Sequence, residues 1–296
     1  MRPRKKSLGS VRPTDPVWLA DWLEMQVLRS QDWNASRGDL QSWLRIQTAG
    51  EDDDPQEGEE RLILETFGEL ERRATAARRA YPFKVSPPLV SLRGDDWRSF
   101  SAYVFCLLVS NVGPQNLGRL NAARLFETVA TSAAKRYVSG NAEQFAFPRP
   151  QLPKAFARAV DEICRKIGEG RGMYEGQSCS KNDDHLDVVA WRPFPDRLPG
   201  QIVIFGQCAA GKNWEGKRSE LNPKAFWNKW ISRPSVSRLV RAFFMPHRVP
   251  SEKWCHLGYD AGLVFDRCRI AYWAHGSDEF RQQADWSNLV LRNYAS

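Results

Sequence analysis

The chain has 296 residues, of which 42% are hydrophobic and 26% are charged, and its formal net charge is +8 at pH 7. This composition is typical of a globular protein and excludes collagen-like and wholly disordered chains. No apolar run approaches the roughly 20 residues that span a bilayer, and the basic N-terminus lacks the apolar block of a secretory signal. We therefore expect a cytoplasmic protein with no membrane partner.

The beginning of the chain is expected to be α-helical. Apolar residues recur at helical spacing in residues 14–47 and again in residues 59–80. Between them, residues 51–60 contain seven acids and no base. Such a run cannot bury a core, so we expect an exposed acidic linker near 50–60.

Helices and then strands follow this region. Residues 97–112 predict an apolar, buried helix, and residues 121–138 and 156–167 predict two amphipathic helices. Residues 186–192 and 201–208 are short apolar runs on either side of turn residues, which predicts a β-hairpin. Weaker patterns predict strands at 239–245 and 262–265 and helices near 223–232 and 278–293.

Helices followed by a strand pair and then mixed elements indicate an α/β protein with an added helical region. Prolines at positions 82, 87 and 88 mark a boundary. We therefore expect an N-terminal helical appendage of residues 1–90 and an α/β domain of residues 91–296. The appendage is a candidate binding region for a protein partner or regulator. A homo-oligomer is a further possible assembly.

Positive charge is concentrated in one part of the chain. Residues 201–250 hold nine Lys or Arg residues against two acids. Such a field favours a polyanion, because cations that contact phosphates release condensed counterions. A solvated basic face is an equally good interpretation. The candidate nucleic-acid contacts are Lys217, Arg218, Arg238 and Arg241.

Two oxygen-bearing residues belong to the predicted hairpin. Asp187 opens its first strand, and Gln207 stands near the end of its second strand. In a hairpin of this length these two positions meet at one edge of the sheet. A carboxylate and a second oxygen ligand can hold Mg²⁺ or Mn²⁺, since such ions keep several waters and need few protein ligands. A bound ion of this kind could promote phosphodiester hydrolysis.

The stretches LFETVATSAAKRYVSG (125–140) and KNDDHLDVVAWRPFPDRLPGQIVIFGQCAAGKNW (181–214) resemble the PD-(D/E)XK restriction-endonuclease-like superfamily. The resemblance implies a mixed central sheet flanked by helices and a metal-dependent endonuclease acting on DNA or, as a second choice, RNA. It also implies that Asp187 and Gln207 bind the metal ion and that Glu127 on the preceding helix assists. Defence of a prokaryote against foreign DNA is the setting that it suggests.

The superfamily's lysine is where the match fails. Its usual position, two residues after Gln207, is occupied by Ala209. The resemblance implies that Lys212 or, as a weaker candidate, Lys217 supplies the cation from the following loop. This departure leaves a second hypothesis open, in which the chain is a catalytically inactive nucleic-acid-binding or adaptor module of the same fold.

Further alternatives come from single motifs. Residues 206–212 satisfy G-x-x-x-x-G-K after an apolar strand, which is the pattern of a P-loop nucleotide hydrolase. Asn213 replaces the hydroxyl residue that such loops need for Mg²⁺, so this interpretation is less favoured. Glu162 competes with Glu127 as the helix acid. Trp191 and Trp214 could stack on bases, although core packing is the simpler expectation.

Overall fold

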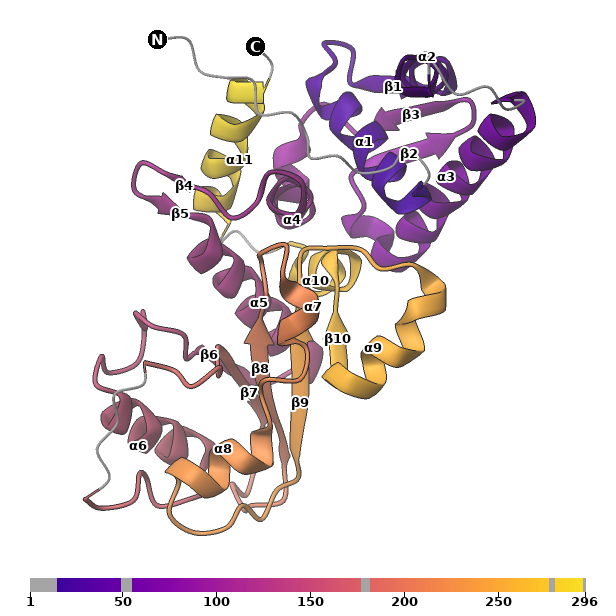
Figure 1. Cartoon of the computed structure of the whole chain (residues 1–296). Coiled ribbons are helices and arrows are strands. Elements are labelled where there is room, and N and C mark those ends of the chain that lie inside the picture. Colours follow the sequence, from indigo (N-terminus) through magenta and orange to yellow (C-terminus); the bar gives the residue numbers. More distant parts are fainter. Residues whose placement is uncertain (1–14, 49–54, 177–181, 277–279, 295–296) are drawn as a thin grey trace.

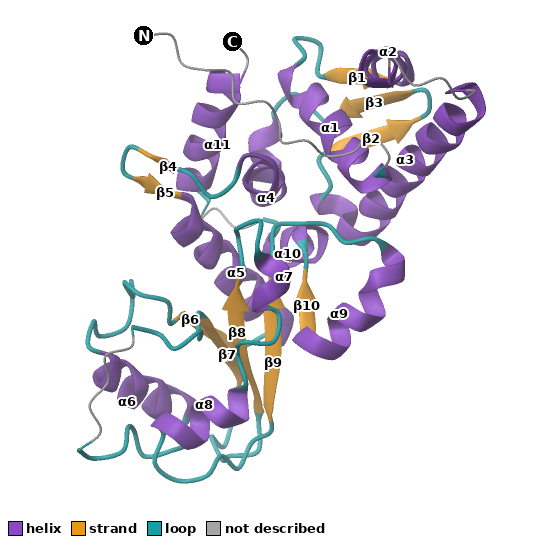
Figure 2. Ribbon diagram, viewed as in Figure 1, coloured by secondary structure: helices purple, strands orange, loops and turns teal. Residues whose placement is uncertain are grey.

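The computed structural model describes residues 15–48, 55–176, 182–276 and 280–294, and Figure 1 shows their arrangement. They form a mixed α/β fold with one five-stranded sheet and two smaller antiparallel sheets. Helices lie against both faces of the large sheet (Figure 2). The predicted α/β class is therefore confirmed.

The N-terminal region contains helices and a small three-stranded sheet of order β1-β3-β2. Apolar periodicity predicts the helices but not the sheet, because its strands are only three or four residues long. The elements are α1 (Pro16–Arg29), β1 (Asn34–Ser36), α2 (Arg37–Thr48), α3 (Pro55–Ala77), β2 (Phe83–Ser86) and β3 (Leu89–Leu92). Because α3 begins at Pro55, the second half of the acidic stretch is helical and not a linker; residues 49–54 lie outside the described ranges.

Helix α4 (Ser101–Val112) lies at the centre of the largest core cluster, which explains why it is apolar on nearly all sides. A short hairpin of β4 (Asn116–Leu117) and β5 (Leu120–Asn121) leads from it to α5 (Ala122–Val138). The side chain of Asn121 caps α5 by accepting a hydrogen bond from a first-turn amide. None of the helices in the described ranges is long and apolar enough to span a membrane.

The five-stranded sheet has the order β10-β9-β8-β7-β6. Strands β6, β7 and β8 are antiparallel neighbours, whereas β8, β9 and β10 run parallel to one another. The predicted hairpin is β7 with β8, and its ladder runs from Arg192↔Ile202 to Val188↔Gly206. The strands are β6 (Asn141–Gln144), β7 (Val188–Arg192), β8 (Ile202–Cys208), β9 (Leu239–Phe244) and β10 (Leu263–Phe265).

Both faces of this sheet are buried, which explains the nearly continuous apolar runs in its central strands. Val188 and Ala190 pack with α4 and α5 on one face, while Val189 and Trp191 pack with α6 and α8 on the other. This alternation is the expected two-residue period of a strand. The remaining helices are α6 (Phe156–Ile167), α7 (Trp214–Lys217), α8 (Pro223–Trp230), α9 (Trp254–Ala261), α10 (Arg267–Ala274) and α11 (Arg281–Tyr294).

A buried network of ion pairs connects the N-terminal helices with the rest of the fold. Arg73 of α3 is fully buried and contacts Asp21 at 2.7 Å and Glu24 at 2.9 Å, both on α1. Arg267, the first residue of α10, also pairs with Asp21. One core cluster runs through both parts of the chain. The boundary expected at residue 90 therefore falls within β3, and the core is continuous across it.

Candidate active site

Asp187 lies at the head of β7, where main-chain contacts fix its position. Its amide donates to the carbonyl of Gly206 at 2.9 Å, and its carbonyl accepts the amide of Phe145 at 2.7 Å. Its carboxylate accepts a 2.6 Å hydrogen bond from the amide of Cys208. The carboxylate is therefore held at the end of the sheet where β7 begins and β8 ends, and the residue retains partial exposure.

Glu127 reaches the same end of the sheet from α5. This helix buries Phe126 and Val129 in the core cluster that includes one face of the sheet. Gln144, the last residue of β6, donates a 2.8 Å hydrogen bond from its amide nitrogen to the Glu127 carboxylate. Helix α5 is thus connected through Glu127 to the strand that neighbours β7.

The carboxylates of this region act on one another. Burial, opposed by the hydrogen bond from Gln144 and aided by the charge of Asp183, raises the pKa of Glu127 to about 7. Burial and then the charge of Glu127 raise the pKa of Asp187 well above its usual range, whereas Lys217 lowers it. Acidic groups whose ionised forms repel one another in a partly buried place attract a cation.

Gln207, the predicted second ligand, is 4% exposed and lies one residue beyond the last ladder pair of β8 with β7. Its amide nitrogen donates to Glu220 at 2.7 Å. Glu220 is in turn 3.3 Å from the Nδ1 atom of His185. Within the described part of the chain, no contact joins the Gln207 side chain to Asp187 or Glu127, so an ion shared by these three residues stays a prediction.

Of the two candidate lysines, Lys217 is the one whose charge reaches Asp187 and lowers its pKa. It is the last residue of α7 and is half-buried. Lys212 is exposed in the loop before α7, and no contact between it and the carboxylates is found in the described ranges. Ala209, at the family's lysine position, is 1% exposed and packs in an apolar cluster. A lysine at that position would be buried.

The site includes four polar residues that the sequence analysis does not single out: Gln144, Asp183, His185 and Glu220. The run KNDDHLD at 181–187 was the available signal for two of them. Only the structure separates the roles within this run. Asp184 binds Lys229 at 2.8 Å and the indole nitrogen of Trp230 at 2.7 Å, so it anchors the turn to α8.

The other predicted nucleic-acid contacts do not gather around the carboxylates. Arg218 is paired with Asp260 at 2.9 Å. Arg241 is half-buried in β9 and donates to a main-chain carbonyl. Arg238 precedes β9 at the opposite end of the sheet, about 16 Å from the level of Gln207 at the usual rise of a parallel strand. Of the four predicted contacts, Lys217 is therefore the one found at the site.

The alternative candidates from the sequence, one acid and two tryptophans, make contacts that separate them from the carboxylates. Glu162 pairs with Arg165 on α6 at 2.6 Å, and the structure gives it no contact with Asp187 in the described ranges. Trp191 is 3% exposed within the core, which leaves its ring unavailable for stacking on a base. Trp214 is half-buried, and its ring stacks on that of His247 with 6.0 Å between centroids.

The P-loop-like motif has a packing role. Gly206 lies inside β8, where an added Cβ would come within 2.6 Å of the Phe244 ring. The helix that follows the motif, α7, has four residues. A phosphate-binding loop relies on the amides and dipole of a substantial helix N-terminus. The glycine is therefore explained by the close approach of a core aromatic ring.

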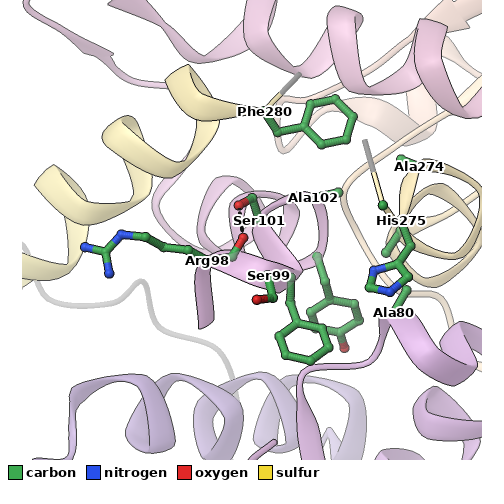
Figure 3. A pocket seen from close by; sticks show the side chains of 12 residues that line it. Ala80, Arg98, Ser99, Ser101, Ala102, Ala274, His275 and Phe280 are labelled. Carbon is green, nitrogen blue, oxygen red and sulfur yellow. Dashed lines mark hydrogen bonds between the residues drawn. The ribbon is translucent and has the colours of Figure 1, made fainter. Parts of the chain in front are cut away.

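Figure 3 shows side chains that line a cavity at the N-terminal end of α4. The volume of this cavity is about 30 Å³. It is lined in part by Phe100 and His275, whose rings stack with 6.1 Å between centroids. The volume is enough for roughly one or two waters. Since none of the predicted site residues lines this cavity, it is not part of the candidate active site.

A divalent ion is compatible with the donors at the head of β7, although they are few. The described residues contain no group of three or more His, Cys, Asp or Glu side chains arranged to hold a metal ion. Asp187 and Glu127 supply carboxylate oxygens, which suit Mg²⁺ or Mn²⁺ with several retained waters. The side chain of Gln207 contacts Glu220, and no contact joins it to either carboxylate in the described ranges. No family model, curated protein or solved structure matches the chain. Its function therefore has to be argued from the site.

Proposed function

We propose that the chain is a metal-dependent endonuclease that hydrolyses phosphodiester bonds of DNA. The observation that carries this proposal is the placement of two carboxylates at one end of the sheet, Asp187 by the Cys208 amide and Glu127 by Gln144, with Lys217 near enough to lower the pKa of Asp187. Two repelling carboxylates favour a divalent cation, and a nearby ammonium favours a phosphate. Together they suit a substrate that is anionic and a reaction in which further negative charge develops.

The order of elements supports the resemblance to the PD-(D/E)XK superfamily. A helix carrying Glu127 precedes the sheet, Asp187 opens a strand, and Gln207 stands near the end of the adjacent antiparallel strand. The sheet is mixed and is flanked by helices. Prokaryotic defence against foreign DNA, in the cytoplasm, is the setting that this resemblance implies, and fold analogy alone does not decide it.

In this proposal Asp187, Gln207 and Glu127 hold Mg²⁺ or Mn²⁺, which supplies positive charge to the phosphodiester and lowers the pKa of a bound water. Lys217 orients the attacking water or neutralises charge on the phosphate. Glu127 has a pKa of about 7. Since a bound divalent ion stabilises the ionised carboxylate, metal binding would release a proton from Glu127 near neutral pH.

The inactive module is the second candidate function. Its specific support is the buried, apolar setting of Ala209, where the family's lysine would stand. Under this hypothesis the same residues bind nucleic acid without cleaving it. Lys217 is then a phosphate contact only.

Cleavage of plasmid DNA distinguishes the two. We expect the wild type to nick or linearise the plasmid with Mg²⁺ or Mn²⁺, and to be inactive with EDTA or as Asp187→Asn. Asp285→Asn, an exposed change on α11 outside the site, is the matched control and should stay active. DNA binding without cleavage under all of these conditions would support the module, and a structured RNA in a parallel reaction tests the second substrate class. ATP hydrolysis that Lys212→Ala abolishes would instead support the nucleotide hydrolase.

A further inference from the structure

A second polar cavity lies on the outer side of β6, the edge strand of the large sheet. Its volume is about 520 Å³, within the usual range of small-molecule binding sites. The C-terminal ends of α5 and α6 and the connection between β7 and β8 form its walls. The lining side chains used below are Lys135, Glu143, Arg165, Lys166, Arg197 and Gln201.

The lining carries a marked excess of positive charge. Four of its side chains are cationic and one is a carboxylate. Lys166 pairs with Glu143, the one lining acid, and Arg165 pairs at 2.6 Å with Glu162, which is outside the lining. Lys135 and Arg197 are exposed and make no ion pair with any described residue. The cavity therefore has two cations whose charge is not compensated.

These cations come from three separate parts of the chain. Lys135 belongs to the last turn of α5, Arg165 and Lys166 to the last turn of α6, and Arg197 to the hairpin connection. Folding brings them together around one cavity, although like charges repel one another. An anion would offset that repulsion.

Gln201 forms the buried part of the lining and is 6% exposed. Its amide nitrogen donates to the carbonyl of Ile167 at 2.7 Å, which fixes the side chain. Its amide oxygen is buried and has no hydrogen-bond partner. A buried acceptor of this kind is normally satisfied by a water, and the second hydrogen of that water can be donated to an anion in the cavity.

The lining favours phosphate groups over a nucleobase. Trp191 is the aromatic residue of the lining, but it is 3% exposed and its ring packs in the core between the sheet and α6. Stacking on a base needs an accessible ring face. Lysine and arginine side chains, by contrast, are the usual ligands of phosphate oxygens.

The cavity also lies close to the candidate active site. Strand β6 runs from Asn141, which lines the cavity, to Gln144, which binds Glu127. Three residues of an antiparallel strand cover about 10 Å. A nucleic-acid strand at the active site could therefore place a phosphate two or three nucleotides away in the cavity.

We propose that this cavity, named here the β6 phosphate pocket, binds phosphate groups through Lys135, Arg165, Lys166 and Arg197. The phosphates are those of a nucleic-acid strand or of a free oligophosphate. Only the nucleic-acid source rests on the proposed function, because it joins the pocket to the site of cleavage.

Binding is measured with the full chain in EDTA, which prevents metal-dependent cleavage. One arm uses a fluorescent 12-nucleotide single-stranded DNA followed by anisotropy, and the other uses inorganic triphosphate followed by calorimetry. The pocket variant is Lys135→Glu with Arg197→Glu. The matched control is Lys84→Glu with Arg119→Glu, two exposed cations that do not line the pocket and that give the same change in net charge.

We expect the pocket variant to bind about 10- to 100-fold more weakly than the wild type at 50 mM salt. The slope of its log affinity against log salt concentration should be shallower by about two, because two cations are lost. The affinity of the control variant should fall by less than about threefold.

If the pocket variant loses affinity for DNA alone, a nucleic-acid strand is the source of the phosphates. If it loses affinity for triphosphate, a free oligophosphate is the source. No binding in either arm, or equal losses in pocket and control variants with unchanged circular dichroism, would overturn the proposal. Pocket-dependent binding without any cleavage in Mg²⁺ would reject the proposed nuclease and leave the pocket standing.

Discussion

The amide of Cys208 donates a 2.6 Å hydrogen bond to the carboxylate of Asp187, one step beyond the last paired residues of β7 and β8. At this point a side-chain oxygen replaces the carbonyl that a continued ladder would offer. The carboxylate is thus positioned by the main chain of the neighbouring strand. Because a single amide satisfies one of its oxygens, the group keeps acceptor capacity for a cation.

Asp187→Asn should stabilise the metal-free protein. The change removes a charge that burial and Glu127 both disfavour, while an amide oxygen can still accept from Cys208. We expect the free energy of unfolding at pH 8 in EDTA to rise by about 1–2 kcal/mol, as is common when an active-site charge is removed. Mg²⁺ should raise the melting temperature of the wild type but not of this variant. A variant less stable than the wild type in EDTA would contradict the prediction. As a contrast, Asp184→Asn should be destabilising, since Asp184 is paired with Lys229.

The stability of the metal-free protein should fall as the pH rises from about 4.5 to about 7. Glu127 has a pKa of about 7 in the fold against a usual value of 4.5. Over this interval the folded state holds a proton that the unfolded state has lost, so stability decreases with pH. The contribution is of the order of 1–3 kcal/mol. Urea titrations in EDTA across this range measure it. Glu127→Gln should flatten the dependence, and an unaltered slope in that variant would assign the effect to other groups.

Arg73→Met should strongly destabilise the chain. Arg73 is fully buried and contacts Asp21, Glu24 and Glu69, so its loss leaves buried carboxylates without their partner. We expect a cost of about 3–5 kcal/mol in denaturant unfolding. Arg72→Met is the neighbouring control, because the Arg72 side chain is 53% exposed and the buried Glu69 keeps its pairs with Arg73 and Arg248 without it. This change should cost less than about 1 kcal/mol. Similar costs for the two variants would show that the buried network is not the cause.

Gly206→Ala should destabilise the sheet. The added methyl group would lie 2.6 Å from a ring carbon of Phe244, which is fully buried. Overpacking of this kind costs about 1–3 kcal/mol. Gly216→Ala in α7 meets no atom within 4 Å and should be neutral or slightly stabilising. Thermal melts of both variants test the pair, and an unchanged Gly206→Ala protein would refute the close-packing explanation.

Lys217→Ala should reduce plasmid cleavage far more than Lys212→Ala does. The charge of Lys217 reaches Asp187, whereas Lys212 is exposed in the loop before α7. A group that assists the attacking water typically contributes about 10²- to 10⁴-fold to the rate. Rates under saturating Mg²⁺ measure the difference. A larger loss for Lys212→Ala would return the lysine role to the residue that the sequence resemblance favours.

The hydrophobic pattern of the sequence was sufficient to predict the helices and strands in which that pattern is pronounced. Helix α6 spans Phe156–Ile167 as its periodicity predicts, and β7 and β8 coincide with two apolar runs around a turn. In these segments each residue's own preference agrees with its burial. Strand β6 carried no such signal, because it is a four-residue edge strand with polar residues that depends on β7 for its pairing.

The residues of the candidate site could be predicted only in part, because most of them are brought together by tertiary packing. The place of Asp187 at the head of the first strand follows from the hairpin pattern, whereas the contact of Gln207 with Glu220 does not. Lys217, Gln144 and the β6 phosphate pocket join residues separated by many positions, and no local preference encodes such distances. The same is true of Arg73 and Asp21, whose charges are tolerated in the interior only because packing brings them together. Residue type therefore indicated which chemistry was available, and long-range packing, which sums many weak contacts across the whole chain, decided which groups meet.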